Sequence, residues 1–324
     1  MKKAPIIVTG GAGFIGSSVV KELNSRGYQN IIVVDNLGTS EKWKNLVGKG
    51  VRDIIHKSAF FDWLKTKAPK EIGAIVHLGA CSNTLECNAD YLLENNIHYS
   101  MRLAEFALER SLRFVYASSA ATYGAMESGF SDDHAKLETL QPLNMYGYSK
   151  HFFDLWLLQN LLLDKVTGLK YFNVFGPNEY HKGRMASAIV KLLPDVCSKG
   201  QVSLFASDHP EYSDGEQSRD FIYVRDVASM TCDFVEAKAY GIFNIGSGQA
   251  CSWNRLAKAI FLACKKPANI SYIEMPKDLQ GKYQYFTQAD MTKTRKAIGK
   301  RELYTIEEAV FEYVQNFLLE GKRW

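Results

Sequence analysis

The chain has 324 residues, of which 46% are hydrophobic and 23% are charged, and its formal net charge at pH 7 is +4. A chain of this length and composition buries a large core, and it suits one doubly wound domain with a smaller appendage. The small excess of positive charge is dispersed along the sequence, which argues against a nucleic-acid-binding or membrane-binding surface.

The chain begins MKKAPIIVTGG, with two lysines and a short apolar run that glycines soon interrupt. This run is too short for a signal-peptide core or a membrane span, so we expect a cytoplasmic protein. The cysteines show neither a C-x-x-C pair nor a histidine partner at metal-ligand spacing. We therefore expect no metal and interpret the cysteines as buried, reduced thiols. They are Cys81, Cys87, Cys197, Cys232, Cys251 and Cys264.

Short β-branched runs alternate with amphipathic segments through the first half of the chain. The expected strands cover residues 6–8, 31–34, 54–55, 74–78, 114–117 and 169–172, and long helices are expected over 91–109 and 146–163. Such alternation is typical of βαβ units and a parallel sheet. The predicted fold class is therefore α/β, a Rossmann doubly wound parallel sheet with a smaller C-terminal α/β substrate-binding lobe.

The rhythm changes after Gly176-Pro177. Expected helices now mix with expected strands. The helices are expected over 185–198, 224–236, 253–264 and 306–319, and the strands over 241–245 and 270–274. We predict an NAD(P)-binding Rossmann domain over 1–176 and a substrate-binding lobe over 177–324, with some segments of the lobe returning to the Rossmann domain. A polar, net acidic loop over 206–218 is also expected.

Three glycines follow the first expected strand in a G-x-x-G-x-x-G pattern, Gly10, Gly13 and Gly16, and a helix is expected to start near Phe14. Gly10 permits a tight turn, Gly13 lets the backbone approach a pyrophosphate, and Gly16 lets the helix pack on the sheet. The N–H groups of the helix then face the anion. The pattern predicts a dinucleotide site.

The second expected strand ends at Asp35-Asn36, where a carboxylate can accept hydrogen bonds from the adenosine ribose. This feature by itself favours NAD over NADP. Lys42 and Lys57 could neutralise a ribose 2′-phosphate, although residue type alone favours solvated surface charges. The fourth strand ends in HLGACS at 77–82, where small residues leave room for a dinucleotide and His77 is expected to be structural.

Tyr146 and Lys150 form a Y-x-x-x-K motif that opens an expected helix, so they share one helix face. Lys150 can bond the nicotinamide ribose, and its charge, together with that of the oxidised nicotinamide, favours the phenolate of Tyr146. Ser119, just after an expected strand, would bond the hydroxyl being oxidised. Its neighbour Ser118 could be mistaken for it.

The segments TGGAGFIG at 9–16, SSAATYG at 118–124, YGYSK at 146–150 and RDFIYVRDVA at 219–228 resemble the extended short-chain dehydrogenase/reductase family of nucleotide-sugar epimerases and dehydratases. The resemblance runs essentially end to end. It implies removal of a hydride from a sugar carbon to bound nicotinamide, followed by its return. Dehydratases of the family carry an acidic pair after the serine or threonine, whereas Ala120-Ala121 follows Ser119 here.

Three further segments are similar to the ADP-heptose 6-epimerase branch of that family, namely HLGACSNT at 77–84, YFNVFGPNEYHKGRMAS at 171–187 and GKYQYFTQAD at 281–290. The resemblance implies interconversion of ADP-D-glycero-β-D-manno-heptose and ADP-L-glycero-β-D-manno-heptose at carbon six, for lipopolysaccharide core precursors. It implies that Tyr146 and Lys182 act as acid/base groups on opposite faces of the reacting carbon. It also implies NADP as cofactor, with NAD possible, and a homo-oligomer, a pentamer by family analogy.

The implied catalytic residues are Ser119, Tyr146, Lys150 and Lys182. The residues expected to bind the cofactor are Gly10, Gly13, Phe14, Ile15, Gly16, Asp35, Asn36, Lys42, Lys57, Leu78, Gly79, Ala80, Cys81, Ser82, Asn95, Tyr146 and Lys150. The residues expected to bind the ADP-sugar are Ser119, Asn173, Val174, Arg184, Lys191, Phe205, Ala206, Ser207, Asp208, Arg219 and Tyr283. Arg184 and Lys191 stand where the family usually has serine and histidine, which leaves the contacts there open.

Alternatives remain at this point. A UDP-hexose 4-epimerase would share the glycine pattern, Ser119, Tyr146 and Lys150, but would need no second base at Lys182. A non-catalytic redox sensor would bind the dinucleotide only, yet such proteins commonly lose the reactive tyrosine or lysine.

Arg219 could hold a diphosphate with its guanidinium fork or form a structural salt bridge. The loop over 206–218 looks longer than its family counterpart and could cover the sugar site or form an oligomer contact.

Overall fold

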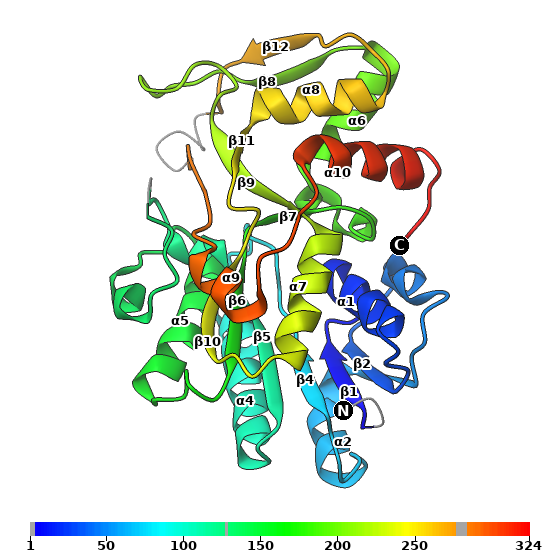
Figure 1. Cartoon of the computed structure of the whole chain (residues 1–324), viewed down its shortest axis with the longest axis vertical. Helices are drawn as coiled ribbons and strands as arrows, with labels where there is room; N and C mark the ends of the chain where they lie inside the picture. Colours follow the sequence, from blue (N-terminus) through cyan, green and yellow to red (C-terminus); the bar gives the residue numbers. More distant parts are fainter. Residues whose placement is uncertain (1–3, 127–128, 277–283) are drawn as a thin grey trace.

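The computed structural model describes residues 4–126, 129–276 and 284–324. At its centre lies a seven-stranded parallel sheet with the strand order β3-β2-β1-β4-β5-β6-β10 (Figure 1). The first six strands are β1 (Ile6–Thr9), β2 (Ile31–Asp35), β3 (Asp53–His56), β4 (Ala74–His77), β5 (Arg113–Ser119) and β6 (Thr167–Tyr171). Every strand expected in the first half of the chain is present, and the order 3-2-1-4-5-6 is that of the Rossmann fold. The predicted fold class is confirmed.

Helices cover the sheet because its inner strands are apolar on both sides. Every residue of β1, β2 and β4 is buried, as expected for parallel strands that helices flank on both faces. The flanking helices include α1 (Phe14–Ser25), α2 (Phe60–Thr66), α4 (Tyr99–Glu109), α5 (Met145–Gln159) and α7 (Val224–Glu236). Helices α1 and α7 lie side by side (Figure 1), and the Cys232 thiol of α7 contacts the Val19 carbonyl of α1.

The two long helices of the first half differ from expectation at their ends. The first starts earlier, as α3 (Ala89–Leu92) with Asn88 as its N-cap, and continues through a π-helical turn over Leu93–His98 into α4. The second, α5, ends at Gln159 rather than near residue 163, because the chain turns at Leu161 with a φ of 56°. A left-handed residue of this kind terminates a helix. The pattern of apolar residues continued past the turn and did not reveal it.

Two segments from the second half of the chain belong to the Rossmann layers. Strand β10 (Gly241–Ile245) pairs in parallel with β6 at the edge of the sheet, and α7 packs on α1. The expectation that a later strand could return to the main sheet is therefore confirmed for β10. The division of the chain into two domains near residue 176 stays a prediction.

The remaining elements form a smaller lobe at the other end of the molecule (Figure 1). It contains a three-stranded sheet in the order β11-β9-β7 and a two-stranded sheet β12-β8. Its elements are β7 (Asn173–Phe175), α6 (Ala188–Lys199), β8 (Val202–Phe205), β9 (Ser218–Tyr223), β11 (Ala250–Ser252), α8 (Trp253–Ala263), β12 (Ile270–Ile273) and α10 (Ile306–Glu312). Helix α9 (Thr292–Ile298) lies near β10 (Figure 1). Helices α6, α8 and α10 share a second hydrophobic core with these short strands.

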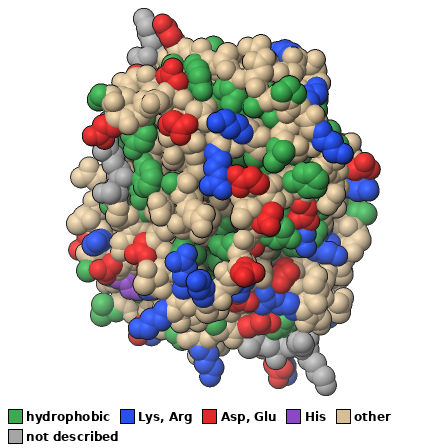
Figure 2. Space-filling view, turned by 45° about the horizontal axis from the view of Figure 1, so that its top comes forward, with side chains coloured by type: hydrophobic (Ala, Val, Ile, Leu, Met, Phe, Trp, Pro, Cys, Tyr) green, Lys and Arg blue, Asp and Glu red, His purple; other side chains and the backbone are tan. Residues whose placement is uncertain are grey.

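The surface bears on two expectations from composition. Cys232 and Cys251 are buried and Cys81 and Cys264 are partly buried, but Cys87 and Cys197 are exposed, so the interpretation of all cysteines as buried is wrong for the last two. Cys87 lies in the loop before α3, and Cys197 lies on the outer side of α6. On the face shown in Figure 2, acidic and basic side chains are interspersed. Within the described ranges, no helix combines the length and the apolar character needed to cross a membrane.

Candidate active site

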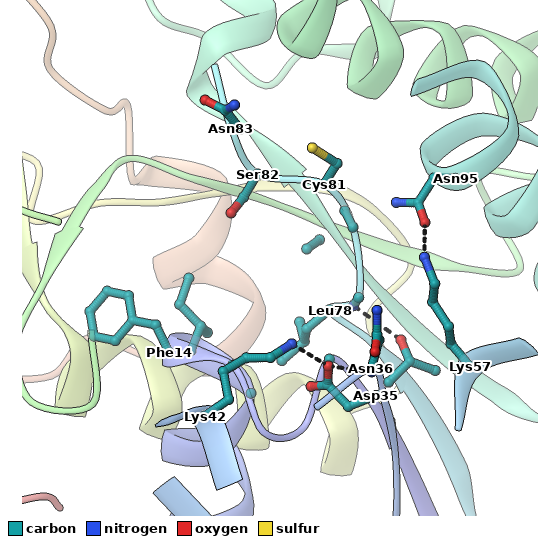
Figure 3. A pocket seen from close by; sticks show the side chains of 18 of the residues that line it. Phe14, Asp35, Asn36, Lys42, Lys57, Leu78, Cys81, Ser82, Asn83 and Asn95 are labelled. Carbon is teal, nitrogen blue, oxygen red and sulfur yellow. Dashed lines mark hydrogen bonds and ion pairs between the residues drawn. The ribbon is translucent and has the colours of Figure 1, made fainter. Parts of the chain in front are cut away.

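The carboxyl ends of β1, β2 and β4 open into a cavity of about 500 Å³. Every residue expected to bind the cofactor lines this cavity, except Tyr146 and Lys150. In Figure 3, Phe14 and Lys42 lie on one side of the cavity, and Cys81, Ser82 and Asn95 lie on the other. A crevice beyond the carboxyl ends of the strands is where α/β sheets of this order bind dinucleotides.

The glycine loop makes the floor of this cavity. Gly10 has a φ of 67°, and a Cβ added to it would lie 2.7 Å from the Gly79 nitrogen. A Cβ on Gly16 would collide with the Gly10 carbonyl oxygen. Gly13 caps α1 without a side-chain hydrogen bond, so the first N–H groups of the helix are left for an anion. The backbone therefore fits the pyrophosphate of a dinucleotide, with no room for a side chain at Gly10 or Gly16.

The end of β2 carries charged groups around Asp35. The Asp35 carboxylate accepts hydrogen bonds from the Ala12 and Asn36 N–H groups, at 2.9 and 2.7 Å, and its Oδ1 lies 2.6 Å from Lys42 Nζ. Across the cavity, Lys57 Nζ donates to Asn95 Oδ1 at 2.6 Å (Figure 3). Both lysines are held in the cavity wall, so neither is a freely solvated surface charge.

The residues expected to react lie beside the cavity, near the end of β5. Lys150 Nζ donates to the Ala117 carbonyl oxygen at 2.9 Å, and Ala117 lines the cavity. The Tyr146 hydroxyl hydrogen-bonds to Ser119, which follows Ala117 by two residues on β5. Ser118 instead donates to the buried carboxylate of Asp154 at 2.7 Å. The structure thus separates the two serines, and Ser119 is the one beside Tyr146.

The electrostatics of this pair differ from the expectation. Burial raises the pKa of Tyr146, and the hydrogen bond from Ser119 opposes that shift only in part. Burial also lowers the pKa of Lys150 to about 8, although the negative charge of Asp154 acts to raise it. In the protein alone, desolvation therefore outweighs the predicted effect of Lys150 on Tyr146, because the charged form of each group is moved out of water.

Lys182 lies on a short helical turn, Tyr180–Met185, that closes the other side of the cavity. Its Nζ is 5.4 Å from the centre of the Phe14 ring. Burial lowers the pKa of Lys182, Glu179 opposes this shift, and the positive charge of Lys191 adds to it. Lys182 is thus a desolvated amine in the cavity wall and not a loop surface charge. Arg184 and Lys191, by contrast, have exposed side chains.

Two of the expected substrate residues share one face of the three-stranded sheet. Asn173 pairs with Phe221, and Arg219 lies two residues before Phe221 on β9, so the three side chains point the same way. Arg219 is 7% exposed and donates to the Ser218 carbonyl at 3.0 Å, whereas Asn173 is exposed and Val174 is half-buried. Backbone N–H groups, including that of Gly248 at 3.0 Å, donate to the Asp220 carboxylate.

The expected substrate residues after β8 lie at the start of the loop over 206–218. Ala206 N donates to the Ile273 carbonyl at 2.8 Å, and Ser207 N donates to Asp214 Oδ1 at 2.8 Å. The Asp208 carboxylate accepts a hydrogen bond from the Tyr285 hydroxyl. Phe205 is half-buried at the end of β8. Tyr283 lies outside the described residues. Of the described residues that were expected to act as acids or bases or to bind the substrate, only Lys182 lines the dinucleotide cavity.

Sequence reasoning missed several residues of the cavity, including Thr9, Asn83, Tyr91, Tyr99, His181 and Met185. It also missed Asn96, which is 1% exposed behind the cavity. Asn96 accepts from Cys81 N at 2.8 Å and donates to the Cys81 carbonyl and to Ser149 Oγ, both at 3.0 Å. It therefore ties the loop after β4 to α5. A polar residue on the buried face of an expected helix was the available signal.

Comparison with known proteins gives consistent results. Residues 6–246 match the model of the NAD dependent epimerase/dehydratase family. An ADP-L-glycero-D-manno-heptose-6-epimerase from Nitratidesulfovibrio vulgaris (strain DP4) is 50% identical over 314 residues, which cover 96% of this chain and 97% of that protein. The enzyme of the same name from Fusobacterium nucleatum is 45% identical over 324 residues, which cover 97% of this chain and 98% of the relative.

Solved structures with the same architecture include two epimerases. The ADP-L-glycero-D-manno-heptose-6-epimerase of Helicobacter pylori superimposes with a TM-score of 0.80 at 26% identity, over 97% of this chain and 96% of that chain. The UDP-N-acetylglucosamine 4-epimerase of Methanobrevibacter ruminantium superimposes with a TM-score of 0.81 at 25% identity, over 99% of this chain and 100% of that chain. The glycine floor, the Tyr146–Ser119 contact and these similarities agree, and the chain belongs to the NAD dependent epimerase/dehydratase family.

Proposed function

We propose that this protein interconverts ADP-D-glycero-β-D-manno-heptose and ADP-L-glycero-β-D-manno-heptose at carbon six, in the supply of heptose for the lipopolysaccharide core. The observation that carries the proposal is the desolvated Lys182 amine in the wall of the dinucleotide cavity. Relatives that are 45% to 50% identical over nearly the whole chain bear the name of this activity. When bound, a nicotinamide dinucleotide supplies reversible hydride acceptance, which permits oxidation and re-reduction of one carbon.

The described residues divide the proton transfers between two sides. Tyr146 and Ser119 hydrogen-bond to each other and would bond the carbon-six oxygen on one side. Lys182 lines the dinucleotide cavity and would act on the other face of carbon six, where the lowering of its pKa by burial favours release of a proton from the amine. A side-chain carbonyl that presents each of its faces in turn needs a proton donor for each face, which one tyrosine does not provide. Lys150 would anchor the nicotinamide ribose and favour the Tyr146 phenolate once the positive nicotinamide is bound.

The cofactor proposed is NADP. A 2′-phosphate near Asp35 would meet the like charge of the carboxylate, and Lys42, 2.6 Å from Asp35, supplies the compensating positive charge. Lys57 would add a second positive charge from the facing wall of the cavity. Mass spectrometry of the dinucleotide released on denaturation checks this, and NAD alone would contradict it. Lys42→Met should weaken NADP binding about tenfold and change NAD binding little.

The substrate residues carry a matching proposal. Arg219 would hold the diphosphate bidentately, and the residues from Phe205 to Asp208, together with Asn173, Val174 and Tyr283, would border the nucleotide. The exposed Arg184 and Lys191 would add positive charge beside them. The homo-oligomer expected from the resemblance and the cytoplasmic location expected from the sequence stay predictions, which light scattering and cell fractionation would check.

The test is to incubate purified protein with ADP-D-glycero-β-D-manno-heptose, without added cofactor, and to follow the configuration at carbon six by proton NMR. Conversion to a mixture of both epimers supports the proposed activity and shows that a bound dinucleotide recycles its hydride. Unchanged substrate, with the dinucleotide confirmed in the protein, would refute it. The structural similarity to a UDP-N-acetylglucosamine 4-epimerase makes UDP-hexose 4-epimerisation the second candidate, so UDP-N-acetylglucosamine is assayed in parallel.

A further inference from the structure

A buried ion pair lies directly behind the strand end that carries Ser119. Lys170 Nζ on β6 is 3.3 Å from the Asp154 carboxylate on α5, and both side chains are 0% exposed. Moving two charges out of water costs several kcal/mol per ion, and a well-packed apolar pair is often as stable. The pair is therefore poorly explained by stability alone.

The hydrogen bonds of this pair lead to the reacting strand end from two directions. The Asp154 carboxylate accepts from Tyr116 Oη at 2.8 Å and from Ser118 Oγ at 2.7 Å. Lys170 donates to Thr122 Oγ1 at 2.6 Å, and Thr122 Oγ1 in turn donates to the Ser119 carbonyl at 2.8 Å. Asp154 thus fixes Ser118, the residue before Ser119, and Lys170 is linked through Thr122 to the backbone of Ser119 itself.

The carboxylate of this pair also acts on Lys150. Asp154 follows Lys150 by one helical turn, and its charge raises the pKa of Lys150 against the lowering effect of burial. The other titratable or charged groups that interact with Lys150, Asp154 or Lys170 come from several elements. They are His77 and Cys81 at the end of β4, Tyr116 on β5, Tyr123 after β5, Asp132 and His134 in the following segment, and His151 on α5.

We propose that the Asp154–Lys170 pair is a positioning device for the reacting centre, which orients Ser119 through Ser118 and Thr122 and supplies the negative charge that balances Lys150. Neither residue touches the substrate in this arrangement. The inference rests on the proposed epimerase function, because it assigns roles to residues that act through Ser119 and Lys150. The proposed role requires no contact between the ion pair and the cofactor.

The first test replaces the whole pair with apolar residues in Asp154→Leu/Lys170→Met, which leaves no lone buried charge. We expect a folded protein that retains its dinucleotide, with kcat lowered at least tenfold, KM within about twofold, and the basic limb of the kcat–pH profile about one pH unit lower. The limb moves down because loss of the Asp154 charge makes Lys150 lose its proton at lower pH. Lys170→Arg, which keeps the charge, should retain most of kcat.

A second variant covers the case in which the double variant fails to fold. Thr122→Val keeps the volume and the ion pair but removes the link from Lys170 to Ser119, and should lower kcat about threefold to tenfold. Thr167→Val is the matched control, since Thr167 on β6 is likewise a buried threonine, hydrogen-bonded to the Ala239 carbonyl, and lies away from Ser119. It should leave kcat and the pH profile unchanged.

A readout without turnover completes the design. The titration of Lys150, followed by the chemical shift of its labelled ε-carbon and assigned with Lys150→Arg, should move about one unit lower in the double variant. Wild-type kcat, pH profile and Lys150 titration in a folded double variant, or wild-type kcat in Thr122→Val, would overturn the inference. Inactivity of the unmodified protein toward ADP-heptose would refute the proposed function instead, and the Lys150 titration would still test the pair.

Discussion

The dinucleotide cavity and the proposed substrate side of the site are made of different parts of the chain. Around the dinucleotide cavity, the floor is backbone at the ends of parallel strands, and Gly10 and Gly16 leave no space for a Cβ. On the proposed substrate side, Arg219 and Asn173 lie on short strands, and the residues from Phe205 to Asp208 lead into a loop. One side depends on the path of the backbone, and the other depends on individual side chains.

This difference predicts two kinds of response to substitution. A Cβ in the backbone floor removes the space that a pyrophosphate needs, so its effect should be close to all-or-none. A changed side chain on the substrate side removes one interaction and should have a graded effect on binding or on a single proton transfer. The predictions below test this contrast, starting with the largest effect.

Gly16→Ala should abolish retention of the dinucleotide and lower epimerase activity more than about 100-fold, because the new Cβ collides with the Gly10 carbonyl. Absorbance of the purified protein near 260 nm and NMR turnover check this. Gly48→Ala is the matched control, since its φ of 75° adds backbone strain of about 1 kcal/mol but no neighbour lies within 4 Å. A Gly16→Ala protein with full cofactor and activity would remove the basis of the comparison.

Lys182→Ala should lower kcat about 100-fold while the dinucleotide stays bound, because one of the two proton donors is lost. Lys182→Arg should not restore activity, since a guanidinium does not give up a proton near neutral pH. Lys199→Ala, an exposed lysine at the end of α6, serves as the control. Unchanged kcat in Lys182→Ala would favour a mechanism with a single acid/base group, as in the 4-epimerase alternative.

Arg219→Lys should raise KM for the ADP-sugar about tenfold and change kcat less than about threefold, because the charge stays while the bidentate fork is lost. Steady-state kinetics with NMR detection measure both constants. Arg255→Lys is the matched control in the same lobe, where the arginine pairs with Glu307 on α10. A loss of bound dinucleotide in Arg219→Lys would show that the two sides are not separable.

His77 supplies a predicted effect of another kind, on stability rather than on turnover. Burial, helped by the charge of Lys150, lowers its pKa to about 3, and its ring nitrogens contact Thr9 Oγ1 at 2.6 Å and Ser100 Oγ at 2.9 Å. The unfolded imidazole takes up a proton near pH 6.5, so this group removes stability as the pH falls from about 6.5 toward 3. The loss is about 1.4 kcal/mol per pH unit.

Urea unfolding at several pH values measures this effect. His77→Gln should unfold more easily at neutral pH yet lose less stability on acidification than the unmodified protein. The exposed His98 provides the control substitution, His98→Gln, which should keep the full dependence on acid. An identical acid dependence in His77→Gln and the unmodified protein would contradict the assignment.

Local sequence was enough to predict most of the Rossmann half and its glycine floor. Buried parallel strands read as continuous apolar runs, and a G-x-x-G-x-x-G spacing directly after the first of them is characteristic of a dinucleotide loop. The predicted strand over 241–245 and the predicted helix over 224–236 agree with β10 and α7 to the residue. The end of α5 and the π-helical turn before α4 were missed, because one left-handed residue or one widened turn leaves the apolar periodicity almost unchanged.

The sequence by itself predicted a doubly wound parallel sheet, placed the glycine loop directly after its first strand, and gave Ser119, Tyr146 and Lys150 as candidate catalytic residues. These features depend on residues close together in the chain. Only the tertiary structure decided that β10 is the strand that returns to the sheet and that Asp154 pairs with Lys170. Such contacts join segments far apart in sequence, and side-chain burial, which sets their charge and hydrogen bonding, exists only once the layers have packed.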